Sequence, residues 1–189
     1  MLLPLLEKRR SIRKFREREI ESEKIGTLLE AALRAPSSMN RRPWEFIVVR
    51  DREMLKRLSM SKPHGASFLK NAPLGIVVCA DPLRCDVWVE DASIASAFLL
   101  LAAESLGLGA CWIQIRARMY DGQKSATTYI AEQLDIPDHL EVEAIVAVGY
   151  PDEEKSPHHK EDLPYEKIHY EKYGGRSGSS KIRMNRSQD

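Results

Sequence analysis

The stretch ASIASAFLLLAA, residues 92–103, constrains the fold most, because it is almost continuously apolar. Asp91 precedes it and Glu104 follows it, and the glycines at 107 and 109 stop the helix that the pattern predicts from about residue 85 to 106. The stretch is too short to cross a membrane, which needs about 20 apolar residues. A helix this apolar has to be buried on most sides, so we expect it inside a globular fold.

Buried strands and further helices flank this central helix. The run at 22–35 has helical spacing, with Ser22 as the expected N-cap and Pro36 as its end, and shorter helices are predicted near 2–10, 51–60 and 124–134. Together with the predicted strands this pattern gives an α+β or α/β class, with the long helix packed against one sheet. The strands are predicted at WEFIVVR, LGIVVCA, ACWIQI and EVEAIVAVGY.

The charge balance excludes a general polyanion binder. The chain has 189 residues, enough for one domain, with 29 Lys and Arg against 28 Asp and Glu and a net charge of +1. Nucleic-acid-binding domains are usually strongly basic, so any anion site must be local. The first residues do not resemble a signal peptide, and Cys79 and Cys111 lie in apolar runs typical of buried reduced thiols. We therefore expect a cytoplasmic protein that binds neither nucleic acid nor membranes.

Two polar segments could bind an anionic or polar ligand. If residues 11–15 of RRSIRKF are extended, Ser11, Arg13 and Phe15 share one side, and arginine and serine are donors suited to a phosphate monoester. The loop APSSMN offers two hydroxyls and an amide to a ligand such as a ribityl chain. A solvated basic face would equally explain the first segment, and an ordinary turn after a helix would explain the second.

No side-chain motif for catalysis or metal binding is present. The sequence has no G-x-S-x-G, P-loop or H-E-x-x-H pattern. His158 and His159 are adjacent, a spacing at which two side chains cannot easily hold one ion. Any chemistry must therefore come from a cofactor, and no catalytic side chain and no metal ligand are expected.

Six segments, in order, resemble the nitroreductase family of FMN-dependent oxidoreductases. They are RRSIRKF, AALRAPSSMNRRPWEFIVV, NAP, DASIASAFLLLAAESLGLGACWI, VAVGYP and HYEKYG, which together span residues 1 to about 174. Each segment alone is only weakly specific for the family, but the occurrence of all six in the same order is highly specific for it.

The resemblance implies a three-layer α/β/α sandwich with a mostly antiparallel central sheet, assembled as an intertwined homodimer. Residues 1–174 would form a single FMN-binding domain, with 151–174 as an arm that embraces the partner and 175–189 as a disordered tail. Two FMN molecules would lie in the interface, each lined by residues of both subunits. The cofactor-binding residues implied are Arg9, Arg10, Ser11, Arg13, Pro36, Ser37, Ser38, Asn40, Ile113, Gln114, His158 and Lys160.

The family also implies the reaction. NADH or NADPH would reduce FMN, and a flat small-molecule acceptor such as a nitroaromatic or a quinone would then take the hydride in a ping-pong cycle. The chain departs from the family at 113–116, which lacks a usual glycine, at 158–162, and at Arg41 and Arg42. These departures leave open a specialised activity, namely flavin destruction, dehalogenation or enal oxidation. The sequence is also compatible with a flavin-binding protein without turnover and, less readily, with a nucleic-acid binder that uses the basic termini.

Overall fold

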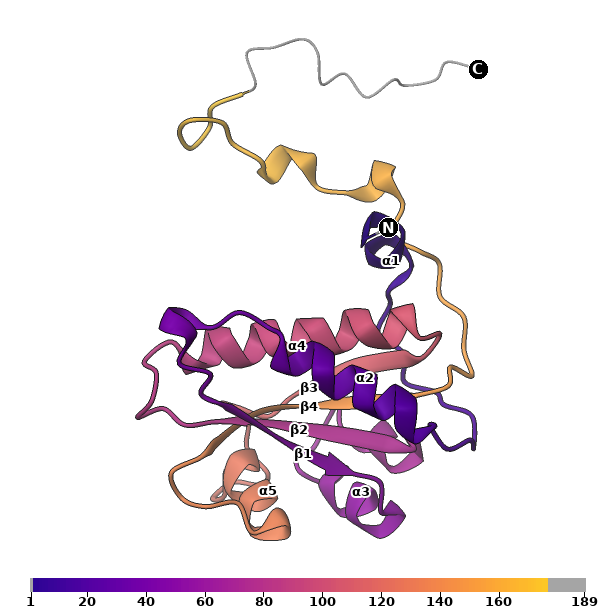
Figure 1. Cartoon of the computed structure of the whole chain (residues 1–189), viewed down its shortest axis with the longest axis vertical. Helices are drawn as coiled ribbons and strands as arrows, with labels where there is room; N and C mark the ends of the chain where they lie inside the picture. Colours follow the sequence, from indigo (N-terminus) through magenta and orange to yellow (C-terminus); the bar gives the residue numbers. More distant parts are fainter. Residues whose placement is uncertain (1, 177–189) are drawn as a thin grey trace. The chain divides into compact units, whose positions relative to one another are not determined.

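A sheet of four antiparallel strands, in the order β1-β2-β4-β3, forms the centre of the molecule (Figure 1). The computed structural model describes residues 2–176. Every strand pair is antiparallel, so the predicted mostly antiparallel sheet is confirmed. The strands are β1 (Trp44–Val49), β2 (Leu74–Ala80), β3 (Gly109–Gln114) and β4 (Glu141–Gly149).

Helices cover both faces of this sheet, which makes three layers. On one face α2 (Ser22–Leu33) and α4 (Trp88–Ser105) pack with residues such as Leu28, Leu99 and Val146. On the other face α3 (Arg52–Leu58) and α5 (Ala126–Leu134) pack with their own cluster of buried side chains. The central strands β2 and β4 are buried almost throughout because both of their faces are covered. The three-layer α+β prediction is therefore confirmed.

Local sequence explains where two of the helices, α3 and α5, begin. The Asp51 side chain accepts a hydrogen bond from Met54 N at the start of α3, and Ser125 does the same for Thr128 N at the start of α5. The predicted N-cap of α2 is wrong by one residue. Glu21 occupies the cap position, and no side chain caps that helix.

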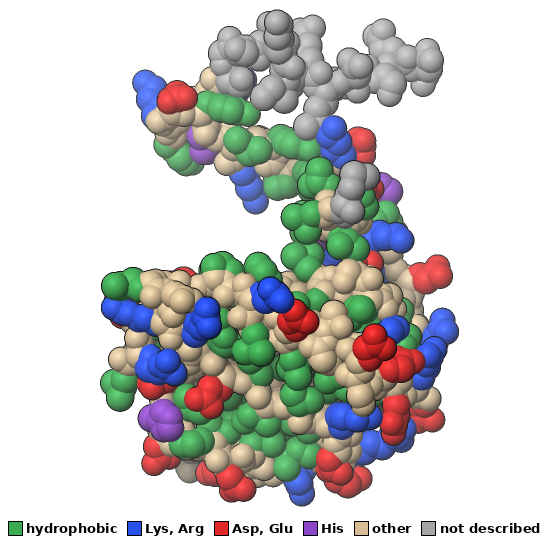
Figure 2. Space-filling view, in the orientation of Figure 1, with side chains coloured by type: hydrophobic (Ala, Val, Ile, Leu, Met, Phe, Trp, Pro, Cys, Tyr) green, Lys and Arg blue, Asp and Glu red, His purple; other side chains and the backbone are tan. Residues whose placement is uncertain are grey.

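The apolar helix α4 is buried on one face only. Its buried positions include Ala92, Ala95 and Leu99, whereas Ile94 and Phe98 are 38% and 37% exposed. The expectation that α4 is buried on most sides is therefore wrong for the single chain, because α2 and the sheet cover only part of its circumference. Figure 2 shows hydrophobic side chains at the surface along α4.

Shorter elements complete the described chain. They are α1 (Leu2–Lys8) and the single-turn helices η1 (Ser38–Asn40), η2 (Ser67–Asn71), η3 (Lys160–Asp162) and η4 (Tyr165–Lys167). The chain divides into two units, 1–157 and 158–189. Most of the tail expected at 175–189 lies outside the described residues. Within residues 2–176, no helix combines the length and the hydropathy needed to span a membrane.

Candidate functional site

The N-terminal basic segment lies along the edge of the sheet formed by β3. Ser11 forms a parallel bridge with Ala110, and Ile12 N donates to Ala110 O at 3.0 Å. Further along, Phe15 forms an antiparallel bridge with Pro151, just after β4. The segment thus crosses from the start of β3 to the end of β4. These main-chain contacts fix the position of the backbone that carries its charged side chains.

The segment does not alternate as a regular strand would. Ile12 and Phe15 are both buried in the same core cluster, whereas Arg13 is exposed. The expected shared side for Ser11, Arg13 and Phe15 is therefore wrong. The reason is that two isolated bridges on different partners replace a continuous ladder, so the chain turns between them.

Glu153 and Lys155 hold this segment in place. One carboxylate oxygen of Glu153 accepts hydrogen bonds from Arg13 N at 2.5 Å and Lys14 N at 3.2 Å. These two main-chain donors, assisted by Lys155, lower the pKa of Glu153, which opposes the effect of its burial. Lys155 Nζ donates to Ser11 O at 2.6 Å and lies 3.6 Å from Glu153. The turn around Ser11 therefore carries an additional cation.

The predicted arginines have different surroundings. Arg9 and Arg10 are half-buried, and Arg10 Nη1 donates to the carbonyl of Ser156. The Arg13 guanidinium is exposed and lies 5.8 Å from the centre of the Phe68 ring. Arg13 is thus the most exposed of the three arginines, although its Nη1 also donates to Ser11 O at 3.5 Å, and the half-buried Ser11 lies beside it.

The outer edge of β3 presents main-chain donors beside this cation cluster. Ile12 N bonds Ala110 O across that edge, and Ile115 N bonds Glu143 O on the opposite side, toward β4. Because main-chain direction alternates along a strand, the N–H groups of Trp112 and Gln114 point outward, away from β4. The N–H of Ile113 points toward β4 and its side chain is 1% exposed. Of the two residues predicted here, only Gln114 therefore faces the edge.

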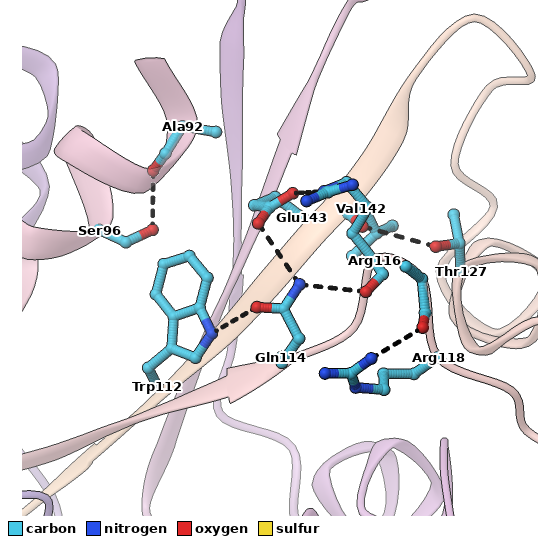
Figure 3. A network of polar contacts seen from close by, with 10 residues as sticks. Ala92, Ser96, Trp112, Gln114, Arg116, Arg118, Thr127, Val142 and Glu143 are labelled. Carbon is cyan, nitrogen blue, oxygen red and sulfur yellow. Dashed lines mark hydrogen bonds and ion pairs between the residues drawn. The ribbon is translucent and has the colours of Figure 1, made fainter. Parts of the chain in front are cut away.

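The side chain of Gln114 is held inside a polar network (Figure 3). Its oxygen accepts from Trp112 Nε1 at 3.0 Å, and its amide nitrogen donates to Arg116 O at 3.0 Å. Arg116 Nε in turn donates to the buried carboxylate of Glu143 at 2.7 Å. This network fixes the end of β3, so Gln114 can offer its main chain to a ligand while its side chain stays engaged.

The second predicted group, the loop around η1, is organised by Asp91. Asp91, 3% exposed in the first turn of α4, accepts from Ser38 N at 2.9 Å. Ser37 Oγ accepts from Arg42 N at 3.0 Å, and Asn40 Oδ1 accepts from Arg42 Nε at 2.8 Å. Three residues of the loop have positive φ, namely Met39, Asn40 and Arg42. A strained loop held by a buried carboxylate is typical of a functional site.

The two predicted groups lie at opposite ends of α4 within one chain (Figure 1). Ser38 is bonded to the first turn of α4, whereas Ser11 is paired with Ala110, shortly after its last turn. A helix of 18 residues is about 27 Å long. The structure thus does not bring Pro36, Ser37, Ser38 and Asn40 next to Ser11 in the same subunit.

His158 and Lys160 lie in the second unit, and their part in the site remains a prediction. Sequence reasoning instead missed Lys155 and Glu153. Their only sequence signal is that they follow the last buried strand within a charged run, PDEEK, which resembles ordinary surface. The pairing of Asp152 N with Lys14 O is what places them beside the N-terminal segment.

A broad groove of about 970 Å³ lies beside the same segment. It is lined by residues 13–19, 50–52 and 70–73 and by Asp152. Most of its charges are paired within the chain, since Arg16 lies 4.0 Å from Asp152, Arg50 3.1 Å from Glu19 and Arg52 3.9 Å from Glu17. The groove therefore offers less free positive charge than its composition indicates.

Comparison with known proteins connects this geometry with a family. The model of the nitroreductase family matches residues 6–62 and 60–150. A protein of Archaeoglobus fulgidus with NADH dehydrogenase/NAD(P)H nitroreductase in its name is 42% identical over 176 residues, 90% of this chain and 98% of the relative.

Solved structures agree with this match. An FMN-dependent nitroreductase from Clostridium difficile R20291 has a TM-score of 0.89 and 51% identity, covering 90% of this chain and 99% of that one. A structure from Desulfovibrio desulfuricans, described as a complex with FMN, has a TM-score of 0.67 and 28% identity, covering 80% and 87%. From its sequence, its fold and these matches, the chain belongs to the nitroreductase family.

Proposed function

We propose that the protein is an FMN-dependent oxidoreductase. It takes hydride from NADH or NADPH and passes it to a flat acceptor such as a nitroaromatic or a quinone. The observation that carries this proposal is the outward-facing donor edge of β3 beside the Arg13 and Lys155 cations. The family match and the relatives that bind FMN or use NAD(P)H by name support it.

The residues present fit FMN by the chemistry of their donors. Ser11, Arg13 and Lys155 supply a hydroxyl and two cations, a set suited to a phosphate and to the polar edge of a flavin. The outward N–H groups of Trp112 and Gln114 add main-chain donors for ring acceptor atoms. When bound, FMN supplies the hydride chemistry, for which no side chain of this site needs to act as a nucleophile.

The chain's own residues bind and orient the ring. Arg13 would help to hold the polar edge of FMN, and its positive charge would favour the reduced, negatively charged form. Glu153 fixes the main chain of Arg13 and Lys14, so that this cation is held in place before the ligand binds. The network around Gln114 fixes the end of β3, whose outward main-chain donors would contact the ring.

A homodimer explains how the second group of residues contributes. The loop around η1 and the segment around Ser11 are separated by the length of α4, so they cannot line the same ligand within one subunit. Each site would combine the segment around Ser11 of one subunit with the loop around η1 of the other. The exposed Ile94 and Phe98 on α4 give a surface that a second copy would cover. In this arrangement Ser37, Ser38 and Asn40 line the FMN held by the partner's basic segment, and His158 and Lys160 complete its phosphate contacts.

The buried free thiols of Cys79, Cys85 and Cys111 fit a reducing compartment, for which we propose the cytoplasm.

Anaerobic stopped-flow absorbance tests the proposal. The purified protein is reconstituted with FMN and mixed with NADH or NADPH, and a panel of acceptors is added after reduction. We expect bleaching of the flavin band by at least one nucleotide and its recovery with a nitroaromatic or quinone acceptor. Protein that takes up no FMN would overturn the proposal. Protein that binds FMN but is reduced by neither nucleotide would instead favour a flavin-binding protein without turnover.

A further inference from the structure

Three exposed arginines gather around η1 with only one acidic partner between them. Arg41 and Arg42 directly follow η1, and Arg84 lies in the loop that joins β2 to α4. Figure 2 shows basic side chains gathered at this end of α4. Arg41 Nη1 lies 3.5 Å from the carboxylate of Asp86. Arg42 and Arg84 form no ion pair with any residue between 2 and 176.

Hydrogen bonds hold these two arginines against the same short stretch of main chain. Arg84 Nη2 donates to Arg41 O at 3.3 Å, and that carbonyl belongs to the peptide bond that joins Arg41 to Arg42. Arg42 Nε donates to Asn40 Oδ1 at 2.8 Å. Two guanidinium groups from separate loops are therefore held close to one peptide bond.

The neighbouring aspartates are already engaged. Asp81 Oδ1 accepts from Leu83 N at 2.8 Å. Asp91 accepts from Ser38 N at 2.9 Å and from the Cys85 thiol at 3.3 Å. The two guanidinium groups without an ion pair thus keep N–H donors from which no residue between 2 and 176 accepts. Their planar, forked arrangement suits a carboxylate or a phosphate.

The proposed dimer brings these cations beside the flavin. Asn40 would line the FMN that the other subunit holds, and the Arg42 side chain is bonded to Asn40. The phosphate of that FMN is already assigned to the segment around Ser11. Like charges this close repel one another, so an anion that binds between them is stabilised. The ligand left for the arginines is the substrate that enters beside the ring.

We propose that Arg42 and Arg84 bind a negatively charged group, a carboxylate or a phosphate, on the substrate that exchanges hydride with the flavin. The inference rests on the proposed function. The anion is either the additional phosphate that distinguishes NADPH from NADH or an acidic group on the acceptor, and the same donors fit both. The two arginines would thus select among substrates that the flavin itself does not distinguish.

Three variants test this selection. Arg42→Gln, Arg84→Gln and the double variant remove charge and keep an N–H donor at each position. Arg34→Gln is the matched control, because Arg34 is an exposed arginine shortly before the same loop whose charge is paired with Glu30 at 2.6 Å. One readout is kcat/KM for para-nitrobenzoate divided by that for the neutral para-nitrobenzamide. The other is the rate constant of flavin reduction by NADPH divided by that by NADH, both at limiting nucleotide.

We expect each single variant to lower one of these ratios about threefold and the double variant about tenfold, as solvent-exposed ion pairs would. Added salt should weaken the wild-type preference, and Arg34→Gln should leave both ratios unchanged. A lower nitrobenzoate ratio would identify the acceptor as the source of the anion, and a lower NADPH ratio would identify the donor. A double variant that binds FMN and keeps both wild-type ratios would overturn the inference and leave the proposed function standing. A wild type that binds no FMN, or that neither nucleotide reduces, would overturn both.

Discussion

At the scale of single residues, the clearest electrostatic feature is the cluster around Tyr150. Its hydroxyl donates to Glu21 at 2.6 Å and accepts from Lys24 Nζ at 2.9 Å. The Arg18 guanidinium lies 3.9 Å from the centre of the Tyr150 ring and bonds Glu21 at 2.7 Å. This cluster joins the end of β4 to the start of α2, where no side chain caps the helix.

The cluster predicts a stability change in acid. The hydrogen bond from Tyr150, with those from Glu21's own main chain and from Arg18, lowers the pKa of Glu21 from 4.5 to about 2. Because the folded pKa is depressed, the stabilisation is present above pH 4.5 and is lost as the pH falls toward 2. We expect Glu21→Gln to lower the melting temperature at pH 7 and to match the wild type near pH 2, as followed by circular dichroism. Glu19→Gln, at a side chain that is 90% exposed, is the control and should leave the profile unchanged. A Glu21→Gln deficit that persists at pH 2 would contradict this origin.

Glu153 predicts a different residue-scale effect, on stability and cofactor binding together. Glu153→Ala leaves Arg13 N and Lys14 N without their acceptor, and hydrogen bonds to a charged group contribute about 1.5–3 kcal/mol each. Water can replace part of these two bonds at a half-buried carboxylate, so we expect a smaller net loss of unfolding free energy, about 1–3 kcal/mol, in urea titrations. The FMN dissociation constant should rise as well, because Arg13 is no longer held. Glu154→Ala, at the exposed neighbour, should change neither quantity.

At the scale of elements, two glycines let the N-terminal segment approach the sheet. A Cβ at Gly109 would lie 2.8 Å from Ile12 Cβ, and one at Gly149 would lie 2.7 Å from Phe15 Cδ1. Both distances are too short for real atoms, so the absence of a side chain is what allows Ile12 and Phe15 to be buried there. The placement of the basic segment therefore depends on packing by its apolar residues.

Gly109→Ala tests this dependence. Forcing Ile12 away from β3 should destabilise the protein by about 1–3 kcal/mol, the usual cost of overpacking, and weaken FMN binding. Gly26→Ala is the matched control, because Gly26 lies within α2 and a Cβ there meets nothing within 4 Å. That substitution should stabilise the protein by roughly 0.5–1 kcal/mol through helix propensity. Urea unfolding of both variants measures the two changes in unfolding free energy, which should have opposite signs. A Gly109→Ala variant as stable as the wild type would contradict the close approach of Ile12 to β3.

The elements were predictable from sequence where one local pattern decided them. The apolar runs gave the strands, and Pro36 and the glycines after α4 gave helix ends. The position of the segment around Ser11 was not predictable, because it depends on bridges to Ala110 and Pro151, about 100 and 136 residues away. The contributions of Glu153 and Lys155 have the same origin, since each meets the N-terminal segment only through the folded chain.

At the scale of the whole molecule, the apolar character of α4 has two separate causes. Its inner face packs on α2 and the sheet, which is the packing expected of the buried helix that the sequence predicts. Its outer face, with Ile94 and Phe98, adds apolar surface that the described single chain leaves exposed. Sequence alone cannot separate these causes, because helical periodicity marks the apolar positions but not the partner that covers them.

Phe98→Arg tests whether a second copy covers that face. A charge at the centre of an apolar interface has to be desolvated without a partner, so the variant should shift the protein from dimer to monomer. Because each proposed site needs the loop around η1 from the other subunit, the FMN dissociation constant should rise in parallel. His139→Arg, at an exposed position between α5 and β4, adds a similar charge on the opposite layer and should leave both quantities unchanged. Sedimentation velocity gives the assembly state and fluorescence titration the affinity. A Phe98→Arg variant that stays dimeric would place the interface elsewhere, and a monomer that binds FMN as tightly as the wild type would show that one subunit suffices for the site.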